Sequence, residues 1–282
     1  MQECPSGSLY MVGLPIGNLG DITLRALWIL SKVDCIAAED TRETKKLLEK
    51  YGISSKLLSV REHNEHEGAE KLIAMLAQGQ RIALVTDAGT PSVSDPGAKV
   101  AKLVAAAGYR VIPVPGASAV ITALSASGLE SAGFSFVGFV PPQTKARGEA
   151  LQKWLGRGEA FVLYEAPHRV RELLLDLATY IQPDREVVIA RELTKKFEEF
   201  SYLKGAELAA WAAEMLPKGE YAVLVGASTQ PATGIELTEE QRAWLIGLMP
   251  LVPASKLAAV AAKVTGLPRS DVYEWIMSQK ES

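Results

Sequence analysis

The sequence predicts an α/β protein with two α/β domains and a small helical appendix at its C-terminal end. Three observations support this class. Short apolar runs typical of strands alternate with helical patterns over 8–127, and strand-like runs are denser over 134–225. From Leu237 onward the apolar residues follow helical spacing alone. The 282 residues also correspond to about two domains at ~150 residues each.

In the first half, five apolar runs predict strands and five intervening patterns predict helices. Asp21 or Thr23 is placed to cap the first helix, and Gly52 and Gly108 follow the ends of two others. This alternation favours a mostly parallel sheet with helices on both faces, whose ligand crevice lies beyond the carboxyl ends of the strands. The predicted strands are 9–12, 35–38, 56–60, 81–86 and 110–114, and the predicted helices are 22–33, 41–51, 67–78, 97–107 and 118–127.

The second half predicts a mixed sheet with fewer helices. Its expected strands are 134–140, 161–165, 186–191, 200–203 and 221–225, and its expected helices are 146–156, 170–180 and 205–214. We expect domains at 1–128 and 129–234 and the helical appendix at 235–282, with a hinge near 128–133 and a linker at 230–234.

Composition excludes several classes of protein. Apolar residues make up 48% and charged residues 22%, which is typical of a globular chain and not of a disordered one. Two cysteines cannot hold together a secreted scaffold of this size, so we expect a cytoplasmic protein with reduced thiols. The uncharged run 111–129 contains two prolines, and it predicts a strand, a turn and a helix instead of a membrane span. With a net charge of −3, any nucleic-acid surface must be local.

The loop after the predicted strand 81–86 is the strongest candidate for ligand binding. It combines small residues with two prolines, two glycines and the carboxylates Asp87 and Asp95. Small residues let a ligand approach the backbone, and proline fixes the loop in advance. Asp87 follows the strand directly and is expected at the crevice, whereas Asp95 is also placed to cap the next helix.

A second small-residue loop, Pro115-Gly116-Ala117-Ser118, also opens a helix. Its amides are able to receive an anionic or polar ligand group, and the alternative is a plain turn. It is not the nucleophile elbow of a serine hydrolase, because Val120 stands where that motif requires glycine.

Two more strand ends carry polar residues. Glu39-Asp40-Thr41-Arg42 is also explained by a helix cap, with Glu43 reaching back, and the basic helix face that follows is by default solvated surface. Tyr164–Arg169 lies in the stretch 145–171, which contains six basic and three acidic residues. This excess of positive charge is able to hold phosphates. His63 and His66 lack further ligands nearby, so we expect no metal site.

Taken together, these motifs resemble the tetrapyrrole-methylase-like (class III) S-adenosylmethionine methyltransferases, in the branch that methylates small-subunit ribosomal RNA. The resemblance spans residues 8–228 and rests on the order of 9–17 with Asp21-Ile22-Thr23, Glu39–Arg42, Thr86–Gly97, Pro113–Ala119, Tyr164–Arg169 and Ala190–Lys195. It implies two α/β domains with S-adenosylmethionine in the cleft between them and a homodimer. It also implies 2′-O-methylation of a cytidine in the decoding region of 16S rRNA, with the small ribosomal subunit as partner and no membrane.

The same resemblance implies which residues contact the methyl donor. They lie on the first loop, the Asp87 loop, the Pro-Gly-Ala-Ser turn and three strand ends of the second domain: Leu14, Pro15, Asp87, Ala88, Gly89, Thr90, Val93, Ser118, Ala119, Tyr164, Leu193 and Ala222.

A ribose hydroxyl is a weak acid, so a base should take its proton during methyl transfer. Asp40, Glu165 and His168 follow strand ends, and among them we select Asp40 as the base. The side chains expected to hold RNA are Arg42, Lys45, Arg61, His168 and Arg169. The C-terminal segment has five basic and five acidic residues, which favours a docking or packing role over a grip on phosphates.

Two other functions remain compatible with the sequence. One is a methylase of a small tetrapyrrole, a corrinoid or porphyrinoid, whose carboxylates would also bind arginines. The other is a non-catalytic nucleotide-sensing module, which would bind the donor or a nucleotide without turnover.

Overall fold

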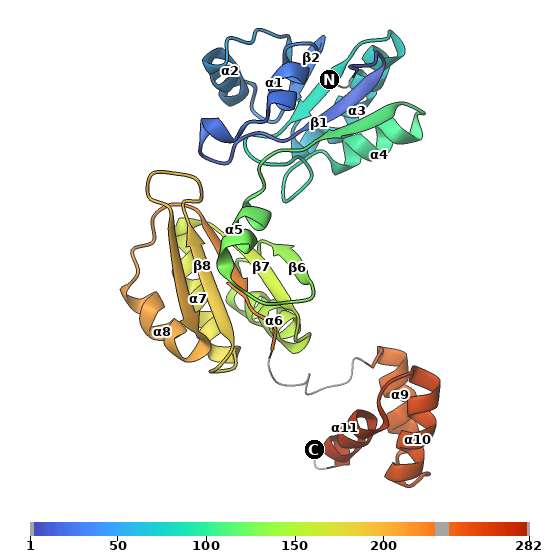
Figure 1. Ribbon diagram of the computed structural model, residues 1–282. Helices are drawn as coiled ribbons and strands as arrows, with labels where there is room; N and C mark the ends of the chain where they lie inside the picture. Colours follow the sequence, from blue (N-terminus) through green and yellow to red (C-terminus); the bar gives the residue numbers. More distant parts are fainter. Residues whose placement is uncertain (1–2, 229–236, 281–282) are drawn as a thin grey trace.

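The computed structural model describes residues 3–228 and 237–280, which form two five-stranded sheets with their covering helices and a three-helix unit (Figure 1). This confirms the predicted fold class. The predicted linker 230–234 lies outside the described residues. Among the described residues, no helix is long and apolar enough to span a membrane.

The first sheet is entirely parallel, with the strand order β3-β2-β4-β1-β5. Its strands are β1 (Ser8–Val12), β2 (Cys35–Ala38), β3 (Leu57–Ser59), β4 (Ile82–Val85) and β5 (Arg110–Val114). Its helices are α1 (Leu24–Leu30), α2 (Thr41–Lys50), α3 (Glu65–Ala77) and α4 (Ala98–Ala106), with the 3-10 turns η1 (Leu19–Asp21) and η2 (Glu62–Asn64).

Both faces of this sheet are buried, because successive strand residues point to opposite sides. Tyr10 packs in one cluster with residues of α1 and α2, whereas its neighbour Leu9 packs with residues of α3 and α4. Thr23 caps α1 by accepting a hydrogen bond from the Ala26 amide at 3.0 Å, as predicted.

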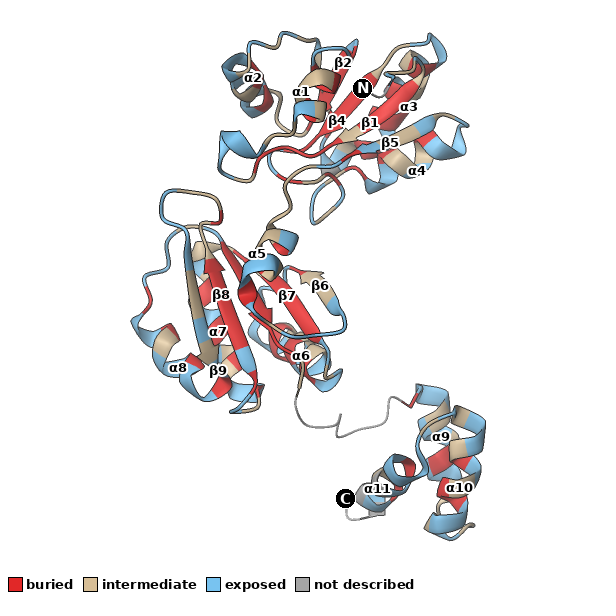
Figure 2. Ribbon diagram, in the orientation of Figure 1, coloured by how far each residue is buried: buried red, intermediate tan, exposed pale blue. Residues whose placement is uncertain are grey.

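The second sheet is mixed, with the order β6-β7-β10-β8-β9. Its strands are β6 (Phe134–Gly138), β7 (Ala160–Glu165), β8 (Glu186–Arg191), β9 (Glu199–Lys204) and β10 (Tyr221–Val225). One face is covered by α6 (Thr144–Gly156), α7 (Pro167–Tyr180) and α8 (Gly205–Glu214), and the red strands of Figure 2 show the resulting core. The predicted strand 134–140 is shorter in the structure because Gly138 has a φ of 71° and the register with β7 shifts there.

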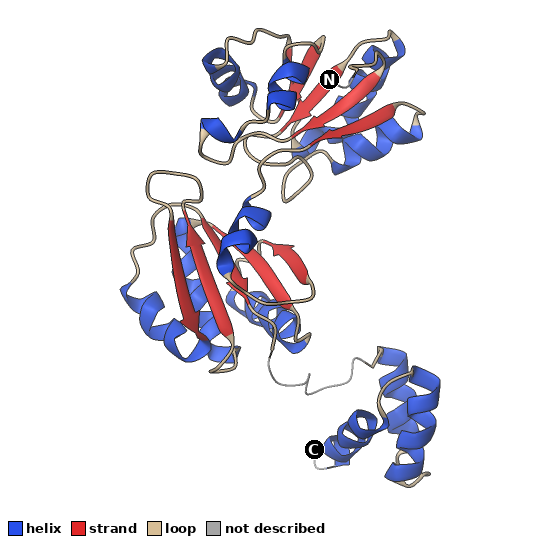
Figure 3. Cartoon of the chain, viewed as in Figure 1, coloured by secondary structure: helices blue, strands red, loops and turns tan. Residues whose placement is uncertain are grey.

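Helix α5 (Ala119–Ser127) covers the other face of the second sheet. Its residues Val120 and Ala123 pack with Val188 and Ala222 of β8 and β10, and Figure 3 shows the helix lying across those strands. The division at residue 128 stays a prediction, but it assigns to the first domain a helix whose packing partners are in the second.

The C-terminal unit consists of α9 (Glu239–Leu248), α10 (Ala254–Thr265) and α11 (Arg269–Lys280). Leu245, Leu257, Ala261 and Ile276 form a small core that contains only residues of this unit. The buried apolar residues of the three helices therefore pack on one another and not on either sheet.

Candidate functional site

A cavity of about 450 Å³ lies where the carboxyl ends of the first sheet meet the second domain. This volume is within the range of roughly 300–1,000 Å³ that is usual for small-molecule sites. The lining residues come from the loops after β1, β2, β4, β5, β6 and β8, from the end of β7 and the loop after it, and from the start of β10: Ile16, Glu39, Asp87, Ala88, Gly89, Thr90, Val93, Ser94, Asp95, Ser118, Ala119, Phe139, Tyr164, Glu165, Ala166, Pro167, Leu193, Glu220, Tyr221 and Ala222.

The first wall is made of two loops that are tied to each other. The Leu14 amide donates to the Gly89 carbonyl at 2.8 Å, and the Gly89 amide donates back to Leu14 at 3.1 Å. Gly89 has a φ of 71°, which only glycine adopts easily, and Thr90 Oγ1 donates to the Ala117 carbonyl at 3.0 Å. The Asp87 loop is therefore fixed before any ligand arrives.

The turn at Gly116 needs glycine for a different reason. A Cβ atom on Gly116 would lie 2.6 Å from the Gly13 carbonyl oxygen, and one on Gly13 would lie 2.8 Å from Gly116 Cα. The backbones at Gly13 and Gly116 thus pass so close to each other that neither position has room for a side chain. This contact places Ser118 and Ala119 on the cavity wall.

Two loops carry uncommon backbone conformations beside the cavity. Ser92 and Ser94 have φ values of 72° and 62° on either side of Val93, and Glu192 and Thr194 have values of 51° and 64° around Leu193. Val93 and Leu193 both line the cavity. Non-glycine residues in this region are strained, and such strain concentrates at functional sites.

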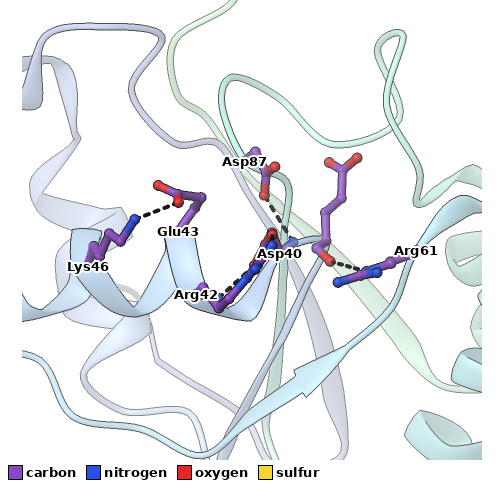
Figure 4. A network of polar contacts seen from close by, with 7 residues as sticks. Asp40, Arg42, Glu43, Lys46, Arg61 and Asp87 are labelled. Atoms are coloured by element: carbon purple, nitrogen blue, oxygen red, sulfur yellow. Dashed lines mark hydrogen bonds and ion pairs between the residues drawn. The ribbon is translucent and has the colours of Figure 1, made fainter.

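Asp87 and Asp40 are linked at the strand ends of β4 and β2 (Figure 4). The Asp40 amide donates to Asp87 Oδ1 at 3.0 Å, while the Asp40 carboxylate caps α2 by accepting from the Arg42 amide at 2.8 Å. Arg42 Nη2 also lies 2.6 Å from Asp40 Oδ2. Hydrogen bonds from the Arg42 side chain and backbone lower the pKa of Asp40, so this carboxylate is a weak proton acceptor.

The cap predicted at Asp40 is confirmed, but Glu43 does not reach back to it. Glu43 Oε1 instead accepts from Lys46 Nζ at 2.7 Å, one turn along the exposed face of α2 (Figure 4). Arg61 Nε donates to the Glu39 carbonyl at 3.3 Å, which brings its guanidinium to the same strand ends.

Asp95 differs from Asp40 in its surroundings. Partial burial, followed by the like charges of Glu39 and Asp87, raises the pKa of Asp95 to about 6. The prediction that Asp95 caps the next helix is wrong, because Gly97 is the N-cap of α4 and its amide donates to the buried Glu65 Oε1 at 2.7 Å.

The second domain supplies the opposite wall. Burial raises the pKa of Tyr164 to about 12, so this hydroxyl is neutral at physiological pH. The Glu165 side chain is fully buried, lies 3.1 Å from Arg169 and accepts a hydrogen bond from the Ala166 amide at 2.9 Å. Apolar Ile16 and Val93 of the first domain pack against the same cluster as Leu193 and complete the wall.

The structure brings together ten of the twelve residues predicted to contact the donor, all except Leu14 and Pro15. These two are buried behind the cavity, where Leu14 holds Gly89 in place. Of the side chains predicted to hold RNA, Arg42, Lys45, Arg61 and His168 are exposed. Arg169 is instead half-buried, paired with Glu165 and bonded to the Val140 carbonyl at 2.8 Å. All of these roles stay predictions.

The phosphate-binding patch predicted over 145–171 is wrong for two of its members. Arg147 is buried, with Nε 2.6 Å from Asp176 Oδ2, and Arg171 bonds the Met215 carbonyl. Charge counting does not reveal which arginines point into the fold.

The sequence did not single out several residues of the site. Ile16, Phe139 and Tyr221 line the cavity, and Glu65 anchors the end of the Asp87 loop from α3. Ile16 adjoins the predicted Leu14-Pro15 pair and was within reach of the strand-end rule, but nothing local marks Glu65 as a buried carboxylate.

Two protein-family models together match most of the chain. Residues 8–209 match the family described as Tetrapyrrole (Corrin/Porphyrin) Methylases, and residues 235–280 match the RsmI C-terminal HTH domain.

Curated relatives match over nearly the whole chain. The Ribosomal RNA small subunit methyltransferase I of Neisseria meningitidis serogroup B is 45% identical, covering 97% of this chain and 94% of the relative. The protein of the same name from Escherichia coli O157:H7 is 42% identical, covering 97% and 96%.

Solved structures confirm the fold. Cobalt precorrin-4 methyltransferase, a cobalamin biosynthetic enzyme, superposes with a TM-score of 0.56 at 17% identity, over 78% of this chain and 95% of that one. A uroporphyrin-III-C-methyltransferase from Thermus thermophilus gives 0.52 at 21% identity, over 78% and 94%.

Proposed function

The chain belongs to the tetrapyrrole methylase family, and from that premise we propose that it methylates small-subunit ribosomal RNA with S-adenosylmethionine as donor. The target we propose is the ribose 2′-oxygen of a cytidine in the decoding region. The relatives named above are small-subunit rRNA methyltransferases, and this chain matches them along nearly their full length. This similarity favours RNA over a tetrapyrrole as the substrate.

The observation that carries this proposal is the interdomain cavity. Its lining includes ten of the residues predicted to contact the donor, and they come from four separate sequence motifs and from strand β10, so segments far apart in the chain converge on one space. A cavity built by pre-fixed small-residue loops suits a ligand that must be held closely and in one orientation.

The residues present fit the proposed donor. S-adenosylmethionine carries a positive ammonium group besides its sulfonium, and Glu39 and Asp87 offer negative charge to the ammonium group on one side of the cavity. Apolar Val93 and Leu193, between their strained neighbours, offer a surface for a nucleoside ring. When bound, the donor supplies an electrophilic methyl group.

The chain itself must position the acceptor oxygen and exclude water. In-line attack needs the ribose oxygen at roughly 3 Å from the methyl carbon, and rigid walls favour such an arrangement. The small uncharged segment Ala88-Gly89 lines the cavity and would leave a sulfonium beside it without a tight anionic partner. This matters because its charge disappears in the transition state.

Exposed cations near the cavity are placed to attract RNA. Arg42 and Arg61 lie on either side of Asp40 (Figure 4), and the Arg42 and Lys45 side chains are 79% and 70% exposed. Such charges would supply sequence-independent attraction, while the cavity would receive a cytidine withdrawn from its stack. We further propose a homodimer and a cytoplasmic location, as the family resemblance implies.

Transfer of labelled methyl groups tests this function. The protein is incubated with S-adenosylmethionine and small ribosomal subunits that lack the modification, and the modified nucleotide is mapped by mass spectrometry. We expect one methyl group on a cytidine ribose. Transfer to a corrinoid precursor without transfer to the subunits would support the tetrapyrrole alternative, and donor binding without any transfer would support a sensing module.

A further inference from the structure

The cavity is lined by five carboxylates, and hydrogen bonds or ion pairs hold three of them in place. Asp87 accepts from the Asp40 amide, Glu165 is paired with Arg169, and Glu220 is paired with Lys195 at 2.7 Å. Glu39 also has a polar partner. Asp95 accepts no hydrogen bond and pairs with no cation within the described residues, although it is exposed in the cavity wall.

The loop that carries Asp95 is fixed at both ends. The Ser92 amide donates to the Pro96 carbonyl at 3.3 Å, and the Gly97 amide is held by the buried Glu65. Ser94 has a left-handed backbone, and a Cβ atom on Gly138 of the second domain would lie 2.9 Å from its Oγ. The Asp95 carboxylate is therefore presented to the cavity by a rigid segment that abuts the second domain.

We propose that Asp95 is a catalytic residue whose carboxylate takes the proton of the ribose 2′-hydroxyl during methyl transfer. This inference rests on the proposed function and replaces Asp40 as the base. In the step, a bond forms between the ribose oxygen and the methyl carbon, and the S–CH₃ bond breaks. Its electron pair stays on sulfur, and the hydroxyl proton moves to Asp95. Charge balances, because the positive sulfonium becomes neutral as the negative carboxylate is protonated.

The electrostatics of the two candidates agree with this assignment. The pKa of Asp95 is raised to about 6, so the carboxylate is ionised at neutral pH and still has affinity for a proton. The pKa of Asp40 is lowered by Arg42, so this group holds a proton far less well. Efficient bases have pKa values near the working pH, which favours Asp95.

The groups that face Asp95 come from the ends of β2 and β4 in the first sheet and of β7 in the second. Glu39 and Asp87 raise its pKa by like charge, and Tyr164 is neutral across the working range because its own pKa is raised to about 12. Arg61 donates a hydrogen bond to the Glu39 backbone carbonyl at the end of β2. Asp95 is thus the group expected to titrate in the lower part of the pH profile.

The test is a single-turnover assay with undermethylated small subunits and saturating S-adenosylmethionine, from pH 5 to 9. The wild-type rate should rise with pH, with a midpoint at or below about 6, and then level off. Asp95→Asn should lower the plateau about 100-fold or more and remove this dependence, whereas Asp95→Glu should restore part of the rate. Donor affinity, measured by calorimetry on the same variants, should stay within about tenfold and shows that the site is intact.

Two controls complete the design. Asp40→Asn should keep the wild-type pH profile, and Asp184→Asn, which alters an exposed carboxylate between α7 and β8, should keep the wild-type rate. If wild type transfers the methyl group and Asp95→Asn does so within threefold, the role of Asp95 is refuted and the proposed function stands. If wild type places no methyl group on a ribose, the proposed function fails and the role of Asp95 fails with it.

Discussion

The ionised Asp95 carboxylate lowers the stability of the folded protein. Its pKa in the folded chain is about 6, above the ordinary value of 3.8, so the folded state binds its proton more tightly than the unfolded state does. Ionisation of Asp95 therefore opposes folding, and stability from the protonated form is lost as pH rises through 6.

Asp95→Asn should make the protein more stable than wild type at pH 8. The substitution removes the charge that partial burial and two like-charged neighbours disfavour. Melting temperatures of both proteins measured from pH 4 to pH 8 check this. The difference should shrink as the pH falls through 6, and equal melting temperatures at pH 8 would contradict the prediction.

Asp87 is expected to act on donor binding instead. Asp87→Ala removes a negative charge from the cavity and the acceptor of the Asp40 amide, so donor affinity should fall by about 10- to 100-fold. Isothermal calorimetry with S-adenosylmethionine measures this directly. No loss of affinity would remove Asp87 from the donor site.

Arg147 lies in a stretch of positive charge, but its side chain is buried and stabilises the fold instead of binding RNA. Arg147→Ala should lower the free energy of unfolding by roughly 1–3 kcal/mol, because Asp176 and the Pro142 carbonyl lose their partner. Denaturant unfolding measures the change, and subunit affinity should stay at the wild-type value. The matched variant Lys145→Ala, at an exposed position of the same helix, should leave stability unchanged.

At the scale of elements, the contact between the Gly13 and Gly116 loops determines the first wall of the cavity. Gly116→Ala would place a Cβ atom 2.6 Å from a backbone oxygen, so the loops must separate. We expect a loss of about 1–3 kcal/mol in stability and weaker donor binding. Gly133→Ala is the control, because its Cβ atom would meet nothing within 4 Å. Unchanged donor affinity in Gly116→Ala would show that the contact does not shape the site.

At the scale of the whole molecule, the three-helix unit has a hydrophobic core that is separate from the cores of the two sheets. None of the described residues of the helical unit lines the cavity, and the core of this unit contains only its own residues. A chain that ends at residue 228 should therefore bind S-adenosylmethionine as tightly as the full chain, within about twofold. Calorimetry on the two proteins checks this, and a weaker affinity in the shorter one would indicate that the unit supports the donor site.

The elements of this fold are largely readable from the sequence. β2 begins and ends at the predicted residues, and Thr23 and Asp40 cap the helices where they were expected to. These features depend on neighbours within a few positions of the chain, which periodicity and capping rules describe. The sequence did not indicate to which domain α5 belongs, because an apolar helix face does not specify which sheet it will cover.

By itself, the sequence determined which loops would form the site, since small residues and carboxylates follow buried strands and parallel strands end at one edge. Only the tertiary structure decided which carboxylate in each loop remains available. Asp40 accepts hydrogen bonds from its own helix and from the Arg42 side chain, whereas Asp95 is close to the like charges of Glu39 and Asp87. The physical reason is that a carboxylate's affinity for a proton depends on burial and on charges brought close by folding, and Glu39, which acts on Asp95, comes from a different strand end.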